Sequence, residues 1–308
     1  MSTLIPADIH KKVLADSVDV PEERPSFPLP LKKVGISGKT VWVRLAGNNG
    51  GRLPFKATIH LNLDGNRRGI HMSRIEQGIT ALHGRKFNSL PEYGSELARL
   101  ILSSQSGSRV SLDLAGQMPL VQKAPVSGLE SVDTIEVSCK LVVEREQGGE
   151  TVTTGAGAAV HHLTACPCTL SYNETLASRF QYPWSRATHS QRSQTQLRVT
   201  PPANLQPPSF GELIAVLDSV LHVSRDLLKR PDETELVLKA HRFPQFSEDS
   251  VREVARAAGR TFGATLPQET RIQVFSRSLE SIHIHDVECS LDTSLGEILT
   301  VRQSIEEE

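Results

Sequence analysis

The sequence predicts an α+β fold made of two successive units, each ordered strand, strand, helix, helix, strand, strand. Three observations lead to this prediction. Segments 40–47 and 55–63 alternate apolar and polar side chains, which is typical of half-buried strands. Apolar residues at helical spacing follow them, most clearly in 90–104. The same order of elements then recurs after the pair Gly148-Gly149.

The N-terminal part of the chain is predicted to be an extended arm, residues 1–36, followed by the first unit at 37–147. The segment PEERPSFPLPL holds four prolines, which fix φ and remove amide donors, so neither a helix nor a central strand is expected there. Between the first two strands, Asn48-Asn49-Gly50-Gly51 predicts the turn of a hairpin. The remaining elements are helices at 74–84, with Ser73 as a cap, and 90–104, then strands at 108–116 and 133–146.

The second unit is predicted at 148–308. Its strands, helices and closing hairpin are expected at 150–165, 194–202, 210–230, 248–263, 271–279 and 282–291. A polar and aromatic excursion runs from Cys166 to His189, between the first two strands of this unit. Loops longer than about 15 residues inside a compact domain are usually functional or disordered, so this excursion marks a candidate site.

The composition is that of a globular protein, with 38% hydrophobic and 22% charged residues. The formal net charge of -1 gives no general attraction to nucleic acid or to an anionic membrane, so neither partner is expected. No stretch approaches the roughly 18 apolar residues of a membrane span, and the start lacks the apolar run of a signal peptide. A cytoplasmic location is therefore expected, where cysteines are thiols or metal ligands rather than disulfides.

Cysteines concentrate in the segment ACPCT, which contains Cys166 and Cys168. A C-x-C pair does not easily give both thiolates to one tetrahedral ion, and no second cysteine pair completes a four-thiolate zinc site. A structural zinc site is therefore disfavoured. Two interpretations stay open, namely small buried thiols that pack as hydrophobic groups and a thiolate in a functional site.

Acidic and imidazole side chains occur together in LESIHIHD, Leu279 to Asp286. On a regular strand His283 and His285 share one face, while Glu280 points to the other. A bulge or a strand start at Ser281 would be needed to bring Glu280 and His283 to one site. The alternative interpretation is an exposed polar strand face.

Two helix boundaries carry further carboxylates. In LKRPDE, a helix is expected to end at Lys229 and Arg230, which leaves Glu233 as an acidic group just beyond it. In FSED, Ser247 is expected to cap the next helix with Glu248 in its first turn, and capping alone explains both residues.

Two basic segments are candidate anion sites. RGIHMSR places His71, Ser73 and Arg74 between a strand and a helix N-terminus, which favours a phosphate group. Arg192 in HSQRS has the same potential, and capping by Ser73 or a solvated Arg192 are the alternatives. Together, all these segments supply a thiolate, imidazoles and carboxylates, the donors that a borderline-soft divalent cation with an open coordination position needs.

Six segments resemble those of a known family. PLKKVGISG, RGIHMSR, CPC followed by THSQRS, LLKRPDE, FSEDSVREVA and ESIHIHD occur in the order found in type IB GTP cyclohydrolases, and the resemblance covers about residues 8–286. It implies a tandem tunnelling fold, in which ββααββ units of neighbouring subunits assemble into barrels. It also implies a homotetramer with active sites between subunits, so that RGIHMSR of one chain and the cysteine of another can share a site.

The resemblance also implies roles for residues of the second half of the chain. Cys166 matches a position that is both a metal ligand and catalytically important. His189, Glu233 and Glu280 match the other metal-binding positions. His283 matches the histidine proposed for proton transfer, so the resemblance predicts one metal-centred catalytic site.

Substrate and reaction follow from the same resemblance. Glu248 matches the carboxylate that anchors the guanine ring, and the triphosphate would be bound by His71, Ser73, Arg74 and Arg192. The implied reaction is metal-dependent hydrolysis of GTP, in which C8 leaves as formate and 7,8-dihydroneopterin triphosphate, the entry to tetrahydrofolate, is formed. Zinc, manganese or iron can serve such a mixed sulfur, nitrogen and oxygen site.

One departure from the family pattern opens an alternative. Bacterial members commonly continue CPCSK with a short run to the histidine, whereas CPCTL here leads into a longer insertion that contains Tyr182, Pro183 and Trp184. The insertion is similar to that of archaeal relatives, which use iron and make 7,8-dihydroneopterin 2′,3′-cyclic phosphate. A non-catalytic pterin- or purine-binding protein of the same fold is a third alternative. The presence of Cys166, Glu233, Glu280 and His283 together argues against it, because binding alone would need Glu248 but not a thiolate.

Overall fold

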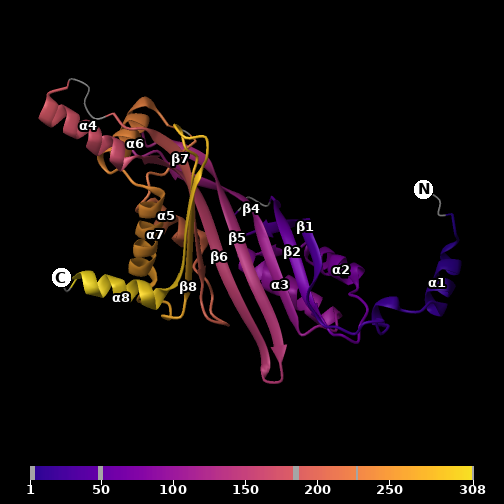
Figure 1. Cartoon of the computed structure of the whole chain (residues 1–308). Helices are drawn as coiled ribbons and strands as arrows, with labels where there is room; N and C mark the ends of the chain where they lie inside the picture. The colour runs from indigo at the N-terminus through magenta and orange to yellow at the C-terminus, as the bar shows by residue number, and fades with distance from the viewer. Residues whose placement is uncertain (1–3, 48–50, 183–186, 227, 307–308) are drawn as a thin grey trace.

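The computed structural model describes residues 4–47, 51–182, 187–226 and 228–306. A single sheet runs through the described chain, with strands in the order β3-β1-β2-β4-β5-β6-β7-β8-β9 (Figure 1). All neighbouring strands are antiparallel except β1 and β3. The strands are β1 Leu31–Leu45, β2 Leu53–Leu63, β3 Lys86–Phe87, β4 Arg109–Lys123, β5 Glu130–Glu146, β6 Gly149–Ala165, β7 Ser190–Thr200, β8 Arg271–Ser278 and β9 Val287–Ser294.

The predicted fold class, two tandem ββααββ units that assemble into barrels, is wrong. The strands expected in separate units belong to one sheet, because β5 and β6 pair from Glu136 with Ala159 to Glu146 with Gly149. The glycine pair that suggested a boundary lies at the tight turn of this hairpin, where Gly149 has a φ of 130°. So short a connection leaves no linker between two units, and the predicted boundary at 147–148 falls inside the turn.

Helices α3, α5 and α7 pack along the sheet. The helices are α1 Ala7–Asp16, α2 Met72–Leu82, α3 Leu90–Ser104, α4 Pro167–Phe180, α5 Phe210–Asp218, α6 Arg230–Arg242, α7 Ser247–Phe262 and α8 Leu295–Glu306. Helix α3 contacts β4 and β5, α5 contacts β6 and β7, and α7 contacts β7, β8 and β9. In the described residues, none of the helices combines the length and the apolar composition that a membrane crossing needs.

Close packing joins the helices to the sheet in one hydrophobic core. Leu97 and Ile101 of α3 are fully buried, as the helical spacing predicts, together with Leu141 of β5. Gly94 allows this approach, since a Cβ at that position would lie 2.4 Å from the Leu141 side chain. An alanine at position 94 would therefore push α3 away from the sheet.

Several predicted elements differ from the observed ones. The N-terminal arm is not wholly extended, because α1 and a short 3-10 helix, Val20–Glu22, form in it. The expected single helix at 210–230 ends at Asp218, and a separate helix, α6, begins at Arg230. The predicted turn residues 48–50 and the insertion residues 183–186 lie outside the described residues.

Candidate metal centre

The ends of β6 and β7 bring Cys166 and His189 together. Cys166 follows the last residue of β6 and His189 precedes the first residue of β7, and the intervening strand ends are paired, Ala165 with Ser190. The Cys166 N–H donates a hydrogen bond to the His189 carbonyl oxygen at 3.1 Å. Antiparallel pairing therefore closes the whole excursion and places its first and last residues side by side.

Gln191 connects this pair to the end of β8. Its Nε2 donates to Oε1 of Glu280 at 3.2 Å, and Ser278 Oγ donates to the same oxygen at 2.8 Å. The Gln191 Oε1 lies 3.1 Å from Nδ1 of His189. Among the described residues, no hydrogen bond reaches Cys166 Sγ, His189 Nε2 or Glu280 Oε2. A sulfur, an imidazole nitrogen and a carboxylate oxygen are thus left without partners at one end of the sheet, and this donor set fits a borderline-soft divalent cation.

Cys166 itself lies at a strand-to-helix junction. It is half-buried and immediately precedes α4, whose first residue is Pro167, a favoured residue for the first helical position. Thr188 Oγ1 donates to the Cys166 carbonyl oxygen at 2.7 Å. Cys168 is exposed. The predicted loop is therefore largely helical, and α4 projects from the end of the sheet (Figure 1).

His283 lies beside His189, although the strand expected around it does not form. The two ring centroids are 6.5 Å apart with perpendicular planes, and His283 stacks on His285 at 5.4 Å. Residues 279–286 form an irregular connection between β8 and β9, in which Ile284 is fully exposed. With no surface to pack against, a regular alternation has no stabilising role here. Glu280 and His283 therefore reach the same end of the sheet.

Glu233 is exposed in the first turn of α6 and has no side-chain hydrogen bond or ion pair within the described residues. The predicted helix end at Lys229 and Arg230 is wrong, because these residues start α6. The Asp232 carboxylate accepts hydrogen bonds from the Lys229 N–H and from two N–H groups of the β4–β5 turn. Burial acts to raise the pKa of Asp232, but these hydrogen bonds outweigh it and hold the pKa below its ordinary value.

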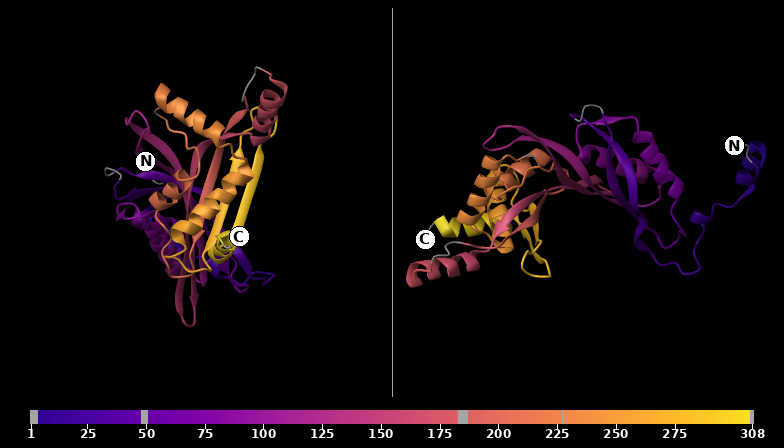
Figure 2. Two further views of the ribbon diagram at one scale, coloured as in Figure 1. Left: turned by 90° about the vertical axis from the view of Figure 1, so that its left-hand side faces the viewer. Right: turned by 90° about the horizontal axis from the view of Figure 1, so that it is seen from above.

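The anion segment RGIHMSR lies at the other end of the molecule from α4 (Figures 1 and 2). Its His71 is held by the N-terminal arm, with Nε2 3.1 Å from Glu22 Oε1 and 3.7 Å from Asp19 Oδ2. In the described part of the chain, only these three residues bring three His, Cys, Asp or Glu ligand atoms within 4.8 Å of one another. The four predicted metal ligands therefore do not form a closed coordination sphere in a single chain.

The other residues of this segment are partly engaged as well. Arg68 Nη1 donates to Glu23 Oε2 at 2.9 Å, and Arg74 Nη1 donates to the Ser104 carbonyl oxygen at 2.8 Å. Ser73 is exposed, and α2 begins one residue before it without a side-chain cap. Ser73 is thus not the predicted cap.

The remaining predicted substrate residues lie on two different elements. Glu248 is exposed in the first turn of α7 near β9, where burial chiefly and the Glu248 charge second raise the pKa of the Cys289 thiol. Arg192 is exposed on β7 and lines a cavity of about 270 Å³ with His161 and Arg225. Among the described residues, neither side chain makes a hydrogen bond to Cys166, His189 or Glu280.

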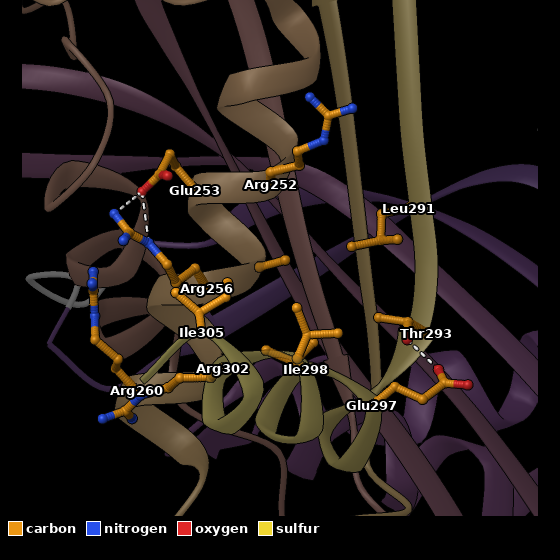
Figure 3. Close-up of a pocket in the computed structure, with 12 residues that line it drawn as sticks. Arg252, Glu253, Arg256, Arg260, Leu291, Thr293, Glu297, Ile298, Arg302 and Ile305 are labelled. Atoms are coloured by element: carbon orange, nitrogen blue, oxygen red, sulfur yellow. Dashed lines mark hydrogen bonds and ion pairs between the residues drawn. The ribbon is translucent and has the colours of Figure 1, made fainter. Parts of the chain in front are cut away.

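A second cavity, of about 650 Å³, opens between α7, β9 and α8 (Figure 3). Arg252, Arg256 and Arg260 of α7 border it, and Ile298 and Val301 of α8 form part of its apolar wall. None of the predicted site residues lines this cavity. Its size therefore does not mark it as the catalytic centre.

The sequence analysis missed a set of buried polar residues on β6, β7 and β8. His162 is fully buried, with Nε2 2.8 Å from Thr195 Oγ1, which lies 2.8 Å from Ser276 Oγ. Burial lowers the pKa of His162 to about 3, so its imidazole is neutral. Gln191 was also missed, because Arg192 is the charged residue of HSQRS and was selected as the candidate there. The available signal was its position two residues after His189, on one face of a strand.

The fold is similar to that of uricases. A uricase from Bacillus fastidious superimposes with a TM-score of 0.51 at 10% identity, covering 88% of this chain and 95% of the uricase. The uricase from Arthrobacter globiformis gives a TM-score of 0.50 at 10% identity, with coverages of 86% and 93%. These similarities concern the fold alone.

Sequence comparison defines the family. The model described as Type I GTP cyclohydrolase folE2 matches residues 18–288. The chain therefore belongs to the type I GTP cyclohydrolase folE2 family, and the resemblance noted from its motifs is confirmed. GTP cyclohydrolase MptA of Methanobrevibacter smithii is 26% identical over 91% of this chain and 96% of its own length. The MptA proteins of Thermoplasma volcanium and Thermoplasma acidophilum are each 30% identical, over 90% and 92% of this chain and 95% and 98% of their own lengths.

Proposed function

We propose that this chain is a metal-dependent GTP cyclohydrolase, which opens the imidazole ring of GTP and releases C8 as formate. The observation that carries the proposal is that Cys166 Sγ, His189 Nε2 and Glu280 Oε2, at the end of the sheet, have no hydrogen-bond partner among the described residues. The family match over residues 18–288 supports GTP as the substrate.

The metal would be held by the Cys166 thiolate, the His189 imidazole and the Glu280 carboxylate, with Glu233 as the fourth predicted ligand. When bound, the ion supplies Lewis acidity for the hydrolytic step. Manganese, zinc and iron all suit such a mixed donor set. Glu233, exposed on α6, would have to approach the other three residues or come from a neighbouring subunit.

His283 and Glu248 would act on the purine. The exposed His283 imidazole, beside His189, would donate a proton to a purine ring nitrogen and later accept one. The Glu248 carboxylate would accept hydrogen bonds from the guanine N–H edge, an arrangement that favours guanine over adenine. Glu248→Gln is expected to raise the KM for GTP by about 10–100-fold, because a hydrogen bond to a charged group contributes about 1.5–3 kcal/mol.

The triphosphate residues support a site shared between subunits. His71, Ser73 and Arg74 lie at the start of α2, which is at the opposite end of the molecule from α4, the helix that follows Cys166, whereas Arg192 lies on β7. A homo-oligomer, for which we propose a tetramer, would bring the two ends of neighbouring chains together. The triphosphate would then replace the arm carboxylates that now contact His71.

The proposed product is 7,8-dihydroneopterin triphosphate. The MptA name of the curated relatives keeps 7,8-dihydroneopterin 2′,3′-cyclic phosphate as the second candidate. Anaerobic incubation with GTP and Mn²⁺, Fe²⁺ or Zn²⁺ tests both, with formate detection and mass analysis of the pterin. Formate with the triphosphate supports the main proposal, formate with the cyclic phosphate supports the second, and intact GTP bound without formate would indicate a non-catalytic binder.

A further inference from the structure

Gln191 is the single described residue whose side chain contacts two of the predicted metal ligands. Its amide lies between His189 and Glu280, 3.1 Å from His189 Nδ1 and 3.2 Å from Glu280 Oε1. It is half-buried at the start of β7, so its backbone is held by the pairing with β6. None of the motif assignments gives this side chain a role.

The chemistry of the two neighbours determines how the amide is oriented. A carboxylate only accepts hydrogen bonds, so the NH₂ group of Gln191 must face Glu280. The amide oxygen then faces His189, and this oxygen only accepts. Nδ1 of a neutral His189 must therefore carry the hydrogen, which leaves the lone pair on Nε2.

The same contacts orient Glu280. Ser278 Oγ and Gln191 Nε2 both donate to Oε1, and none of the described residues makes a hydrogen bond to Oε2. Ligand side chains whose second atom is hydrogen-bonded in this way lose less freedom when a metal binds. One amide thus presets the donor atoms of two side chains.

We propose that Gln191 is a positioning residue that fixes the Nδ1–H tautomer of His189 and directs His189 Nε2 and Glu280 Oε2 toward the metal. This inference rests on the proposed function for the metal, but the tautomer of His189 is a property of the metal-free chain. Gln191 acts through the ligands and does not itself contact the reacting atoms.

The direct test is ¹⁵N NMR of the His189 ring in metal-free protein, with the signal assigned by its loss in His189→Gln. We expect a protonated Nδ1 and an unprotonated Nε2 in the wild-type chain. Gln191→Met, which removes the acceptor, is expected to shift His189 toward the Nε2–H tautomer. Gln191→Glu loses the donor to Glu280 but retains an acceptor for His189 Nδ1–H, so a neutral His189 ring is expected to keep the wild-type tautomer. An Nε2–H tautomer in the wild type, or no change in Gln191→Met, would overturn the proposal.

Metal affinity provides the second readout, measured as Mn²⁺ binding by electron paramagnetic resonance. Gln191→Met is expected to weaken binding by about 10–100-fold, the usual effect of losing a hydrogen-bond partner of a metal ligand. The matched control is Gln273→Met on β8, which removes a similar amide-to-carboxylate bond, to Asp292 at 3.0 Å, away from the site. Equal Mn²⁺ affinity of Gln191→Met and the control would contradict the proposal.

These measurements distinguish failure of the Gln191 role from failure of the proposed reaction. Formate release from GTP by Gln191→Met with unchanged metal affinity would remove the role of Gln191 and leave the proposed function intact. The expected tautomer and metal affinities without formate release would instead remove the proposed reaction.

Discussion

The two ends of the molecule hold their polar residues in opposite ways. At the β6–β8 end, His162, Thr195 and Ser276 are buried and joined by uncharged hydrogen bonds across neighbouring strands. At the α2 end, Arg68 makes an exposed ion pair with Glu23 of the N-terminal arm, and His71 Nε2 lies 3.1 Å from Glu22 Oε1 of the same arm. Strand register fixes the first arrangement, whereas a ligand of the same charge can replace the carboxylates in the second.

This difference indicates which part of the site a single chain can build. Under the proposed function, the donor atoms of Cys166, His189 and Glu280 at the end of the sheet would hold the metal, and contacts within one chain already orient His189 and Glu280. In the proposed shared site, His71, Ser73 and Arg74 would bind phosphate only after an anion displaces the arm carboxylates and a second chain brings its Cys166 end. Variants at each end can separate the contributions of the Cys166 end and the α2 end, and complementation between chains has the largest expected effect.

Complementation tests whether the two ends meet between chains. Cys166→Ala and His71→Ala are each expected to be inactive as pure proteins. Hybrid oligomers assembled from equal amounts of both are expected to regain about a quarter of wild-type formate release, since a shared site receives both native halves by chance at that frequency.

The control for this experiment is a hybrid of Cys166→Ala with Glu280→Gln, both at the metal end. Mixing these two is expected to restore no more than a few per cent, because their native halves lie in the same part of the site. Equal recovery in both hybrids, or no recovery in the first, would contradict a site shared between the two ends.

The buried His162 at the β6–β8 end should make the free energy of unfolding depend on pH. Burial lowers the pKa of His162 to about 3, with the charges of His222 and His161 as smaller causes, whereas an unfolded histidine titrates near 6.5. Unfolding therefore takes up a proton below about pH 6.5, and the stability contributed by neutral His162 is complete above that pH and is lost as the pH falls toward 3. Between pH 7 and pH 5 this loss is about 2 kcal/mol.

Urea unfolding of His162→Gln at the two pH values measures this contribution. The pH-dependent loss of unfolding free energy is expected to be about 2 kcal/mol smaller than in the wild type. His83→Gln, at an exposed position on the C-terminal side of α2, is the control and should keep the wild-type dependence. An unchanged dependence in His162→Gln would show that the imidazole is not held neutral.

Substitutions at the exposed α2 end should give the smallest effect, a change in the KM for GTP. Removing the arm charges by Glu22→Gln with Glu23→Gln is expected to lower the KM for GTP by about 2–5-fold at low salt, because exposed ion pairs contribute about 0.2–1 kcal/mol. The decrease should vanish at high ionic strength. Glu76→Gln on α2, which breaks an exposed ion pair with Lys39 of β1, is the control. A higher KM in the double variant would mean that the arm supports the substrate site.

The local sequence pattern predicted the individual strands better than it predicted which strands pair with each other in the sheet. The alternation of 133–146 and 150–165 correctly indicated β5 and β6, but the glycine pair between them fits a boundary and a hairpin equally well. Only the pairing of the two strands, a long-range property, decides between these interpretations. The prediction of separate units failed for this reason.

Helix boundaries failed where two local rules compete. Cations at 229–230 suit a helix end, while a proline next to them suits a helix start. The buried Asp232 carboxylate decides the matter through hydrogen bonds to the β4–β5 turn, a contact that no local pattern contains. By contrast, the proximity of Cys166 and His189 was anticipated through matched motifs, because their spacing along the chain carries no such information.

The most direct measurement of the central claim uses GTP labelled with ¹³C at C8, followed by NMR after anaerobic loading of the protein with Mn²⁺. We predict ¹³C-formate from the wild type and from Cys168→Ala, and a decrease of more than about 100-fold in Cys166→Ala, which loses a ligand rather than a partner of one. Labelled formate from Cys166→Ala at the wild-type rate, or none from folded wild-type protein with Mn²⁺, Fe²⁺ or Zn²⁺, would contradict the account.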